Sequence, residues 1–158
     1  MLRELRFLRE EKLRVIRDEQ KCLKRLKREK IQKHLQSIPG IGFRTGVILQ
    51  AELWDLLRFK DKNALSSYTG LAPRLVGSGE NEVIRSAGNR KKKELHYVLI
   101  EAAWRSVSYN VEMRARYGSL LHKGFKPQRA ISIIAKRLLY TIRAVWLQER
   151  EFVKPVNE

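Results

Sequence analysis

Residues 37–42 read Ser-Ile-Pro-Gly-Ile-Gly and separate two stretches of helical pattern in a chain of 158 residues. The sequence that follows, TGVILQAELWDLL over residues 45–57, is apolar and helical in pattern. Glycine lets a backbone turn sharply because it lacks a Cβ atom. The stretch therefore predicts a tight hairpin between a helix that ends near residue 36 and a second helix over about 45–57, with Ile38 and Ile41 holding the hairpin between them.

This hairpin is a candidate contact for nucleic acid. It resembles the hairpin of a helix-hairpin-helix element, in which free N–H groups and the positive end of the next helix meet a phosphate. Such a contact positions the nucleic acid without reading its bases. The residues expected to contact DNA or RNA here are Gly40, Gly42, Arg44 and Thr45. The alternative is an ordinary glycine-rich turn between two helices.

The charge of the chain indicates a polyanionic partner. Lys and Arg number 34 against 17 Asp and Glu, which gives a formal charge of +17 and a pI of about 10.4. Nucleic acid is the commonest such partner, because each neutralised phosphate releases counterions. An anionic membrane surface is the alternative partner. A basic structural protein is compatible with the charge as well.

Composition also limits the class of protein. A single cysteine, Cys22, excludes a disulfide framework and a cysteine-rich zinc site. The sequence contains no run of about 18 uncharged apolar residues, so no segment is expected to cross a membrane. Its first residues alternate charge with leucine and do not resemble a secretory signal. We therefore expect a cytoplasmic protein.

Before the hairpin, residues 1–36 contain neither glycine nor proline, and their leucines and isoleucines recur at three- and four-residue steps. This pattern predicts one long amphipathic, coiled-coil-like helix. Polar residues occupy several would-be core positions, so the seam is weak. A helix of this length cannot bury its stripe on itself, and we expect a homo-oligomer through residues 1–36. The alternatives are packing on a domain outside this sequence and a solvated, charged helix.

After the hairpin, periodicity predicts helices over about 62–68, 90–109, 111–121 and 128–149, with Pro127 in a first turn. Between Gly70 and about Asn89 the sequence is rich in glycine and weakly periodic, apart from short extended pieces at 75–76 or 83–84.

The predicted fold class is therefore all-α. A long N-terminal helix over residues 1–36 is followed by a compact helical domain over 37–150, with a helix-hairpin-helix element and a loop-rich central segment; residues 151–158 form a tail. Trp54, Trp104 and Trp146 fall on apolar helix faces, and we expect them in the core rather than stacked on bases.

A basic run, Arg85 to Lys93, lies where a loop enters a predicted helix. Lys and Arg in a first helical turn oppose the helix dipole, which favours a bound anion at that end. The residues of this run expected to contact DNA or RNA are Arg85, Asn89, Arg90, Lys91 and Lys92. The alternative is a solvated charge run.

Ser78 lies between two glycines in the sequence VGSGE, which by itself is an ordinary loop pattern. The three histidines, His34, His96 and His122, are scattered along the chain. No spacing predicts a Ser-His-Asp relay or a metal site in this chain.

The order of motifs resembles a known family. In sequence order they are SIPGIG, TGVILQAEL, RFK, SYTGLAPR, SGE, IRSAGNR, LIEAAW, Y-x-x-L, KP and AKRLLY. This set is similar to the C-terminal transposase domain of the DEDD-type insertion-sequence transposases, whose members are known as bridge-RNA-guided recombinases. The resemblance covers about residues 35–150.

The resemblance implies DNA transposition by a serine that attacks a DNA phosphate and becomes linked to the strand. At matching positions, Ser78 is the nucleophile and Gly79 its close-approach neighbour. Arg85, Asn89 and Arg90 lie near the nucleic-acid backbone, and Arg74 of SYTGLAPR is added to the expected DNA or RNA contacts.

The resemblance also implies partners and a cofactor. The family acts on DNA with a structured guide RNA, and its Mg²⁺ is held by four acidic residues of a separate, N-terminal RuvC-like domain. No cofactor is expected in this chain itself, which we expect to be a fragment of a longer transposase. The alternative function is a non-catalytic helix-hairpin-helix module that binds DNA or RNA, with Ser78 a bystander.

Overall fold

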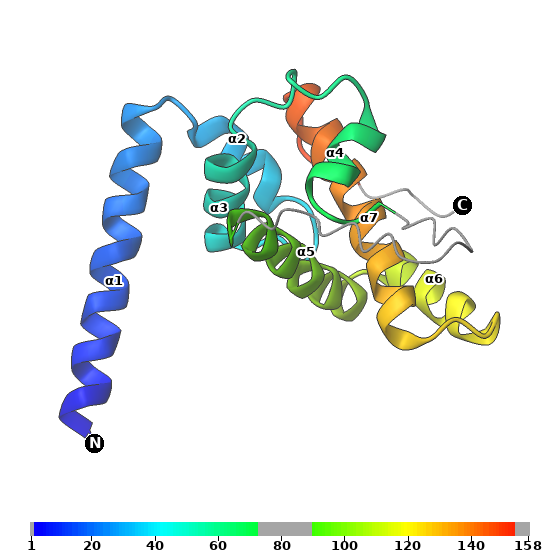
Figure 1. The fold of residues 1–158 in the computed structure, drawn as a ribbon. Coiled ribbons are helices and arrows are strands. Elements are labelled where there is room, and N and C mark those ends of the chain that lie inside the picture. Colours follow the sequence, from blue (N-terminus) through cyan, green and yellow to red (C-terminus); the bar gives the residue numbers. More distant parts are fainter. Residues whose placement is uncertain (1, 73–89, 154–158) are drawn as a thin grey trace.

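The computed structural model describes residues 2–72 and 90–153. Within these ranges the chain forms helices and no strand (Figure 1). The helices are α1 (Leu2–Arg25), α2 (Glu29–Gln36), α3 (Phe43–Leu53), α4 (Lys62–Tyr68), α5 (Arg90–Tyr109), α6 (Val111–His122) and α7 (Pro127–Leu147). The predicted all-α class, with a long first helix, is confirmed.

The predicted single helix over residues 1–36 is wrong in one respect, because a turn at residues 26–28 divides it into α1 and α2. Lys27 has a φ of 54°, the N–H of Arg28 donates to the carbonyl of Leu23 over 2.9 Å, and that of Lys27 donates to Lys24 over 3.0 Å. These bonds form a Schellman motif, which usually has glycine at the left-handed position. Because a lysine occupies that position, the sequence carries no glycine signal for the end of the helix.

The turn leaves α1 projecting from the rest of the molecule as an arm (Figure 1). Its apolar side chains are mostly exposed, including Leu5, Phe7, Leu8 and Val15. Leu23, near the end of the arm that joins the body, is buried. The arm therefore keeps the unburied apolar surface that its sequence predicts.

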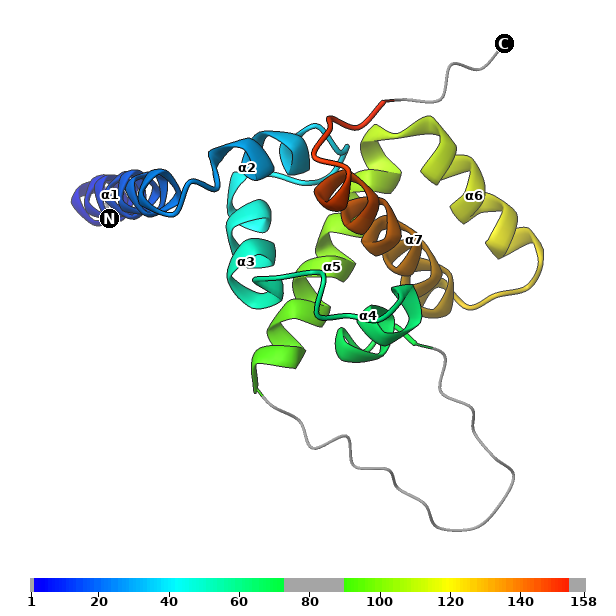
Figure 2. The same cartoon turned by 90° about the horizontal axis from the view of Figure 1, so that it is seen from above.

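The core is built on α5 and α7, which lie side by side with α6 on one side and α2 and α3 on the other (Figure 2). Both helices bury a continuous apolar face. The buried side chains of α5 are Leu95, Leu99, Ala102 and Ala103, and those of α7 include Ile134, Ala135, Leu138, Leu139 and Ile142. This periodic burial explains why both helices were predictable from sequence.

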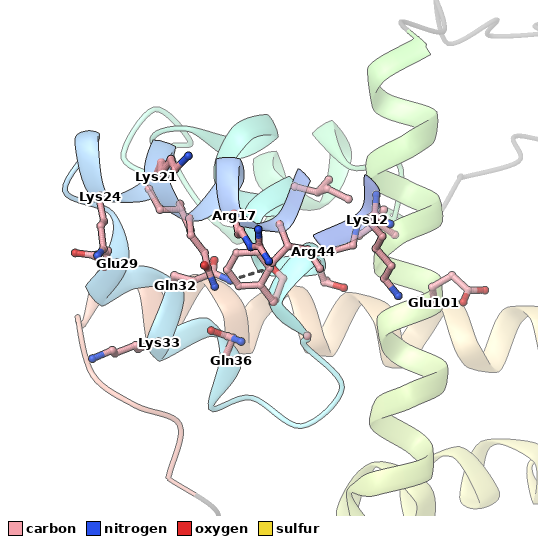
Figure 3. Close-up of a pocket in the computed structure, with 18 of the residues that line it drawn as sticks. Lys12, Arg17, Lys21, Lys24, Glu29, Gln32, Lys33, Gln36, Arg44 and Glu101 are labelled. Atoms are coloured by element: carbon pink, nitrogen blue, oxygen red, sulfur yellow. Dashed lines mark hydrogen bonds between the residues drawn. The ribbon is translucent and has the colours of Figure 1, made fainter. Parts of the chain in front are cut away.

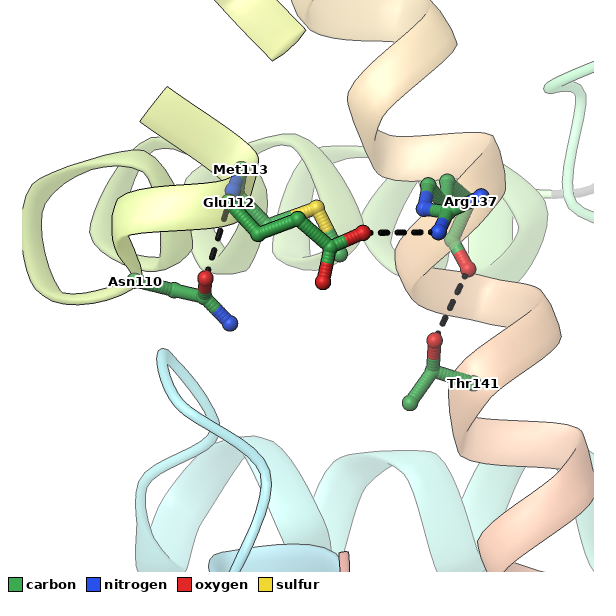
Figure 4. Close-up of polar contacts among 5 residues, drawn as sticks. All are labelled: Asn110, Glu112, Met113, Arg137 and Thr141. Atoms are coloured by element: carbon green, nitrogen blue, oxygen red, sulfur yellow. Dashed lines mark hydrogen bonds and ion pairs between the residues drawn. The ribbon is translucent and has the colours of Figure 1, made fainter. Parts of the chain in front are cut away.

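Polar contacts fix where α6 begins and how it meets α7 (Figure 4). The Asn110 side chain caps α6 by accepting from the Met113 N–H over 3.2 Å. Arg137 of α7 donates to Glu112 of α6 over 2.8 Å. Both partners of this ion pair are well exposed, so it orients the helices more than it stabilises them. Pro127 lies in the first turn of α7, as predicted.

The predicted burial of the three tryptophans is confirmed only for Trp146. Trp54 is 53% exposed, because α3 ends there with a φ of 48° and its indole lies under the guanidinium of Arg28 at 4.3 Å. Trp104 is 41% exposed and packs edge-on against Tyr117 at the surface. For these two residues the prediction is wrong. Each ring packs against a side chain at the surface and does not enter the core.

Several predictions lie outside the described residues. They concern the central loop and its short extended pieces, the end of the tail, and the site residues Arg74, Ser78, Gly79, Arg85 and Asn89. Among residues 2–72 and 90–153, no helix has the length and apolar composition needed to cross a membrane.

Candidate nucleic-acid interface

The hairpin between α2 and α3 is held by its isoleucines. Ile38 and Ile41 are both buried, as predicted, and the N–H of Ile41 donates to the carbonyl of Ile38 over 3.0 Å. Gly42 then begins α3 in an extended conformation, and its carbonyl accepts from the N–H of Gly46 over 2.9 Å. The turn is therefore anchored in the core, with its far end at the start of a helix.

The two glycines of the hairpin have different surroundings. A Cβ atom on Gly40 would lie 2.6 Å from the carbonyl oxygen of Ala102 and from the nitrogen of Ser106, and Gly40 has a φ of +97°. Gly40 thus lets the hairpin approach α5 of its own chain. A Cβ atom on Gly42 would have nothing within 4 Å, and Gly42 is exposed. Gly42 is the glycine with room for a ligand.

The first turn of α3 faces the same open space. No side chain of the described residues caps α3 at Gly42, so the N–H groups of its first turn have no capping partner there. Arg44 is exposed, whereas the side chain of Thr45 is buried. Of the four predicted contacts in the hairpin, Gly42 and Arg44 are therefore at the surface, Gly40 lies in the packing, and Thr45 is buried beneath the lining of the open space next to Gly42.

A buried pair of amides, which the sequence analysis did not identify, fixes the start of α3. Gln32 of α2 donates from its Nε2 to the carbonyl of Phe43 over 2.9 Å, and Gln50 donates to the Oε1 of Gln32 over 2.6 Å. Both glutamine side chains are buried. Gly46 leaves the space for them, since a Cβ atom there would lie 2.7 Å from the Gln32 Oε1. Hydrogen bonds of this kind tie the orientation of α3 to α2.

A groove of about 1320 Å³ opens between α1, α2, the start of α3 and α5 (Figure 3). Among the described residues, its basic lining side chains are Lys12, Arg17, Lys21, Lys24, Lys33, Arg44 and Arg105. Its acidic lining side chains are Glu29 and Glu101. Gly42 lines the groove too, so the open glycine and the cations share one concave surface, which we call the basic groove. A cleft in which one sign of charge predominates concentrates ligands of the opposite sign.

The cations of α1 and α2 were not among the predicted site residues. Arg17, Lys21 and Lys24 recur at four- and three-residue steps, which places them on one face of α1. The sequence shows that spacing. It does not show that this face lies opposite the hairpin, because the turn at residues 26–28 sets the direction of the arm.

The predicted basic run is described only in part. Arg90, Lys91 and Lys92 form the first turn of α5, and the earlier members of the run lie outside the described residues. Two turns into α5, the Nδ1 of His96 lies 3.2 Å from the carbonyl of Thr69. Within the described ranges, no group of three or more His, Cys, Asp or Glu side chains is arranged to hold a metal ion.

Comparison with known proteins places the hairpin in a family. Residues 32–118 match the sequence profile of the Transposase IS116/IS110/IS902 family. The transposase for insertion sequence element IS1111A from Coxiella burnetii is 32% identical over 98 residues, which cover 62% of this chain. The matched residues make up 27% of that relative, so the match spans about a quarter of its length. On the strength of the profile match, which includes most of α2 and all of the hairpin, α3, α4 and α5, the chain belongs to the IS116/IS110/IS902 family of transposases.

Proposed function

We propose that this chain is the part of a transposase that holds DNA and a structured guide RNA and supplies a serine for strand cleavage and rejoining. The observation that carries the proposal is the basic groove, in which cations from α1, α2, α3 and α5 surround the open Gly42. Phosphates are the anions that match such a groove, because Lys and Arg neutralise them and backbone N–H groups donate to them. Family membership makes DNA the first candidate among polyanions.

The serine in this proposal is Ser78, and its support is the match of its SGE motif to the family pattern. Its Oγ would attack a DNA phosphorus and displace a sugar hydroxyl, which leaves with a proton. In rejoining, another sugar hydroxyl would displace the serine, so that the number of phosphodiester bonds is conserved. Nearby Arg and Lys side chains would stabilise the charge that builds up on the phosphate oxygens.

Mg²⁺ enters this proposal only through a separate domain. The described residues offer no cluster of three metal-ligating side chains. We propose that a RuvC-like domain, in the same or another chain, supplies the carboxylates that hold Mg²⁺ in the family.

We also propose that the chain forms a homo-oligomer through its N-terminal arm. An apolar cavity of about 400 Å³ lies between α1 and α3, lined by Val15, Leu26, Val47 and Trp54 among others, and α1 carries further exposed leucines outside it. The α1 helix of a second copy has the apolar face to cover it. Sedimentation of Leu8→Asp should show a shift toward monomer, whereas Phe7→Asp, on another face of α1, should leave the association unchanged. Monomers for the wild-type chain would contradict this part of the proposal.

The experiment that tests the catalytic proposal follows a labelled DNA strand on a denaturing gel, with the domain in a complete transposase and its RNA present. Wild-type protein should trap a covalent protein–DNA species. Ser78→Ala should lack it while binding DNA nearly as well, because one hydroxyl contributes at most about 1 kcal/mol to affinity. Ser119→Ala, an exposed serine of α6, is the matched control. Recombination by Ser78→Ala at the wild-type rate would favour the alternative, a non-catalytic helix-hairpin-helix module.

A further inference from the structure

We infer that the basic groove binds an unpaired strand of nucleic acid, and that Tyr97 of α5 stacks on one of its bases. The inference rests on the proposed nucleic-acid function and adds the class of ligand, a single strand in preference to a duplex. Tyr97 belongs to none of the motifs that the sequence analysis selected.

The position of Tyr97 is the first observation. Its side chain is 65% exposed, and it lines the same groove as Arg44 and Arg105. Among the described residues it makes no hydrogen bond and no ring contact. Its helical neighbours Leu95 and Leu99 are fully buried, so α5 packs one face into the core and presents Tyr97 to the groove. An aromatic ring left open among cations has a free face on which a base can stack.

The arrangement of charge is the second observation. Arg17, Lys21 and Lys24 line the groove from α1, while Arg44 and Arg105 line it from α3 and α5. The span from Lys12 to Lys24 is about 18 Å along the helix axis, enough for several cations to follow one strand. A positively charged groove that follows the backbone, combined with an aromatic side chain, is the arrangement by which proteins bind single strands.

The duplex is disfavoured for a physical reason. In a duplex the bases are paired and stacked on each other, so their faces are covered and Tyr97 has no partner. An unpaired strand exposes its base faces, and its phosphates are free to turn toward both walls of the groove. Stacking on a tyrosine also tolerates any base, because every base has a π face.

The test uses the full chain and fluorescence anisotropy, with a labelled thymidine oligonucleotide of about twelve nucleotides and a duplex of the same length. Tyr97→Ala should weaken binding of the single strand by roughly tenfold, the size of one lost stacking contact. It should change duplex binding less than about twofold. Tyr97→Phe, which keeps the ring, should bind the single strand like the wild-type chain. Tyr109→Ala is the matched control, because Tyr109 is 76% exposed on the same helix and does not line the groove.

The outcomes separate this inference from the proposed function. Equal losses on both ligands, or no loss with Tyr97→Ala, would overturn the role of Tyr97 while leaving nucleic-acid binding in place. Tighter binding of the duplex than of the single strand by the wild-type chain would overturn the ligand class. If the wild-type chain bound neither ligand, the proposed function itself would fail, and this inference with it.

Discussion

Gly40 lies directly against Ala102, so closely that a Cβ atom on Gly40 would come within 2.6 Å of the Ala102 carbonyl oxygen. This contact joins the hairpin to the central helix α5. The hairpin thus packs against α5 through Gly40 and leaves its other glycine, Gly42, open to solvent. Gly40 therefore serves the packing of the hairpin, whereas Gly42, two positions later, has open space beside its backbone.

Gly40→Ala should lower the free energy of unfolding by about 2–4 kcal/mol, because the new methyl group overlaps the α5 backbone and φ is +97°. Gly42→Ala should change it by less than about 1 kcal/mol, since φ is −88° and the position is open. Urea denaturation of the two variants measures both values. Equal destabilisation would contradict the contact between Gly40 and Ala102.

Gln32→Leu should destabilise the chain by about 1–3 kcal/mol, because the amide of Gln50 loses a buried hydrogen bond and the carbonyl of Phe43 a half-buried one. Gln36→Leu, an exposed position on the same helix, should have little effect and serves as control. Thermal unfolding of both variants checks the prediction. If the Gln32 variant were as stable as wild type, the amide pair would not hold α3 in place.

Gly42→Val should weaken binding of all nucleic-acid sequences alike, because a branched side chain would block the approach of a phosphate to the backbone. Gly118→Val, at another open glycine away from the groove, should leave affinity unchanged. Anisotropy titrations with several unrelated oligonucleotides measure the effect. A loss confined to one sequence would indicate base contacts and contradict contact through the backbone.

Asp61 should make the free energy of unfolding fall at acidic pH. Its carboxylate accepts from the N–H groups of Ala64 and Asn63 at the start of α4, and the hydrogen bond from Ala64 contributes most to lowering the pKa of Asp61 below 3.8. A lowered pKa contributes stability that is present above the unfolded value and is lost as the pH falls through the folded value. Asp61→Asn, which retains an accepting oxygen, should show a weaker loss of stability as the pH falls below about 4. An identical acid profile for wild type and variant would contradict this role.

The sequence predicted the helices of the domain well, because their signals are local. Pro127 marks the start of α7, and the apolar faces of α5 and α7 repeat at helical spacing. The break after α1 escaped prediction because Lys27, rather than glycine, adopts the left-handed conformation. Glycine is only the most frequent residue at that position. Here the N–H groups of Lys27 and Arg28 donate the hydrogen bonds that end the helix, although the residue is a lysine.

The candidate site was predictable only in part, for a different reason. Gly42 and Arg44 were identified because the hairpin has a sequence signature. Arg17 comes from α1, whereas Arg105 and Tyr97 come from α5, and each alone looks like an ordinary exposed residue. Their convergence depends on the direction of α1 and the packing of α5. That is a property of the tertiary structure, which no local pattern contains.

The measurement that tests the central claim most directly is the salt dependence of oligonucleotide binding, for wild type, for Arg44→Ala and for Arg150→Ala as a control outside the groove. For a single strand that contacts about six phosphates, log affinity should fall with log salt at a slope near −4 between about 50 and about 200 mM. Arg44→Ala should reduce that slope by roughly 0.7, and Arg150→Ala should not change it. A flat salt profile for the wild-type chain, or equal slopes for wild type and Arg44→Ala, would contradict the assignment of the basic groove as the nucleic-acid interface.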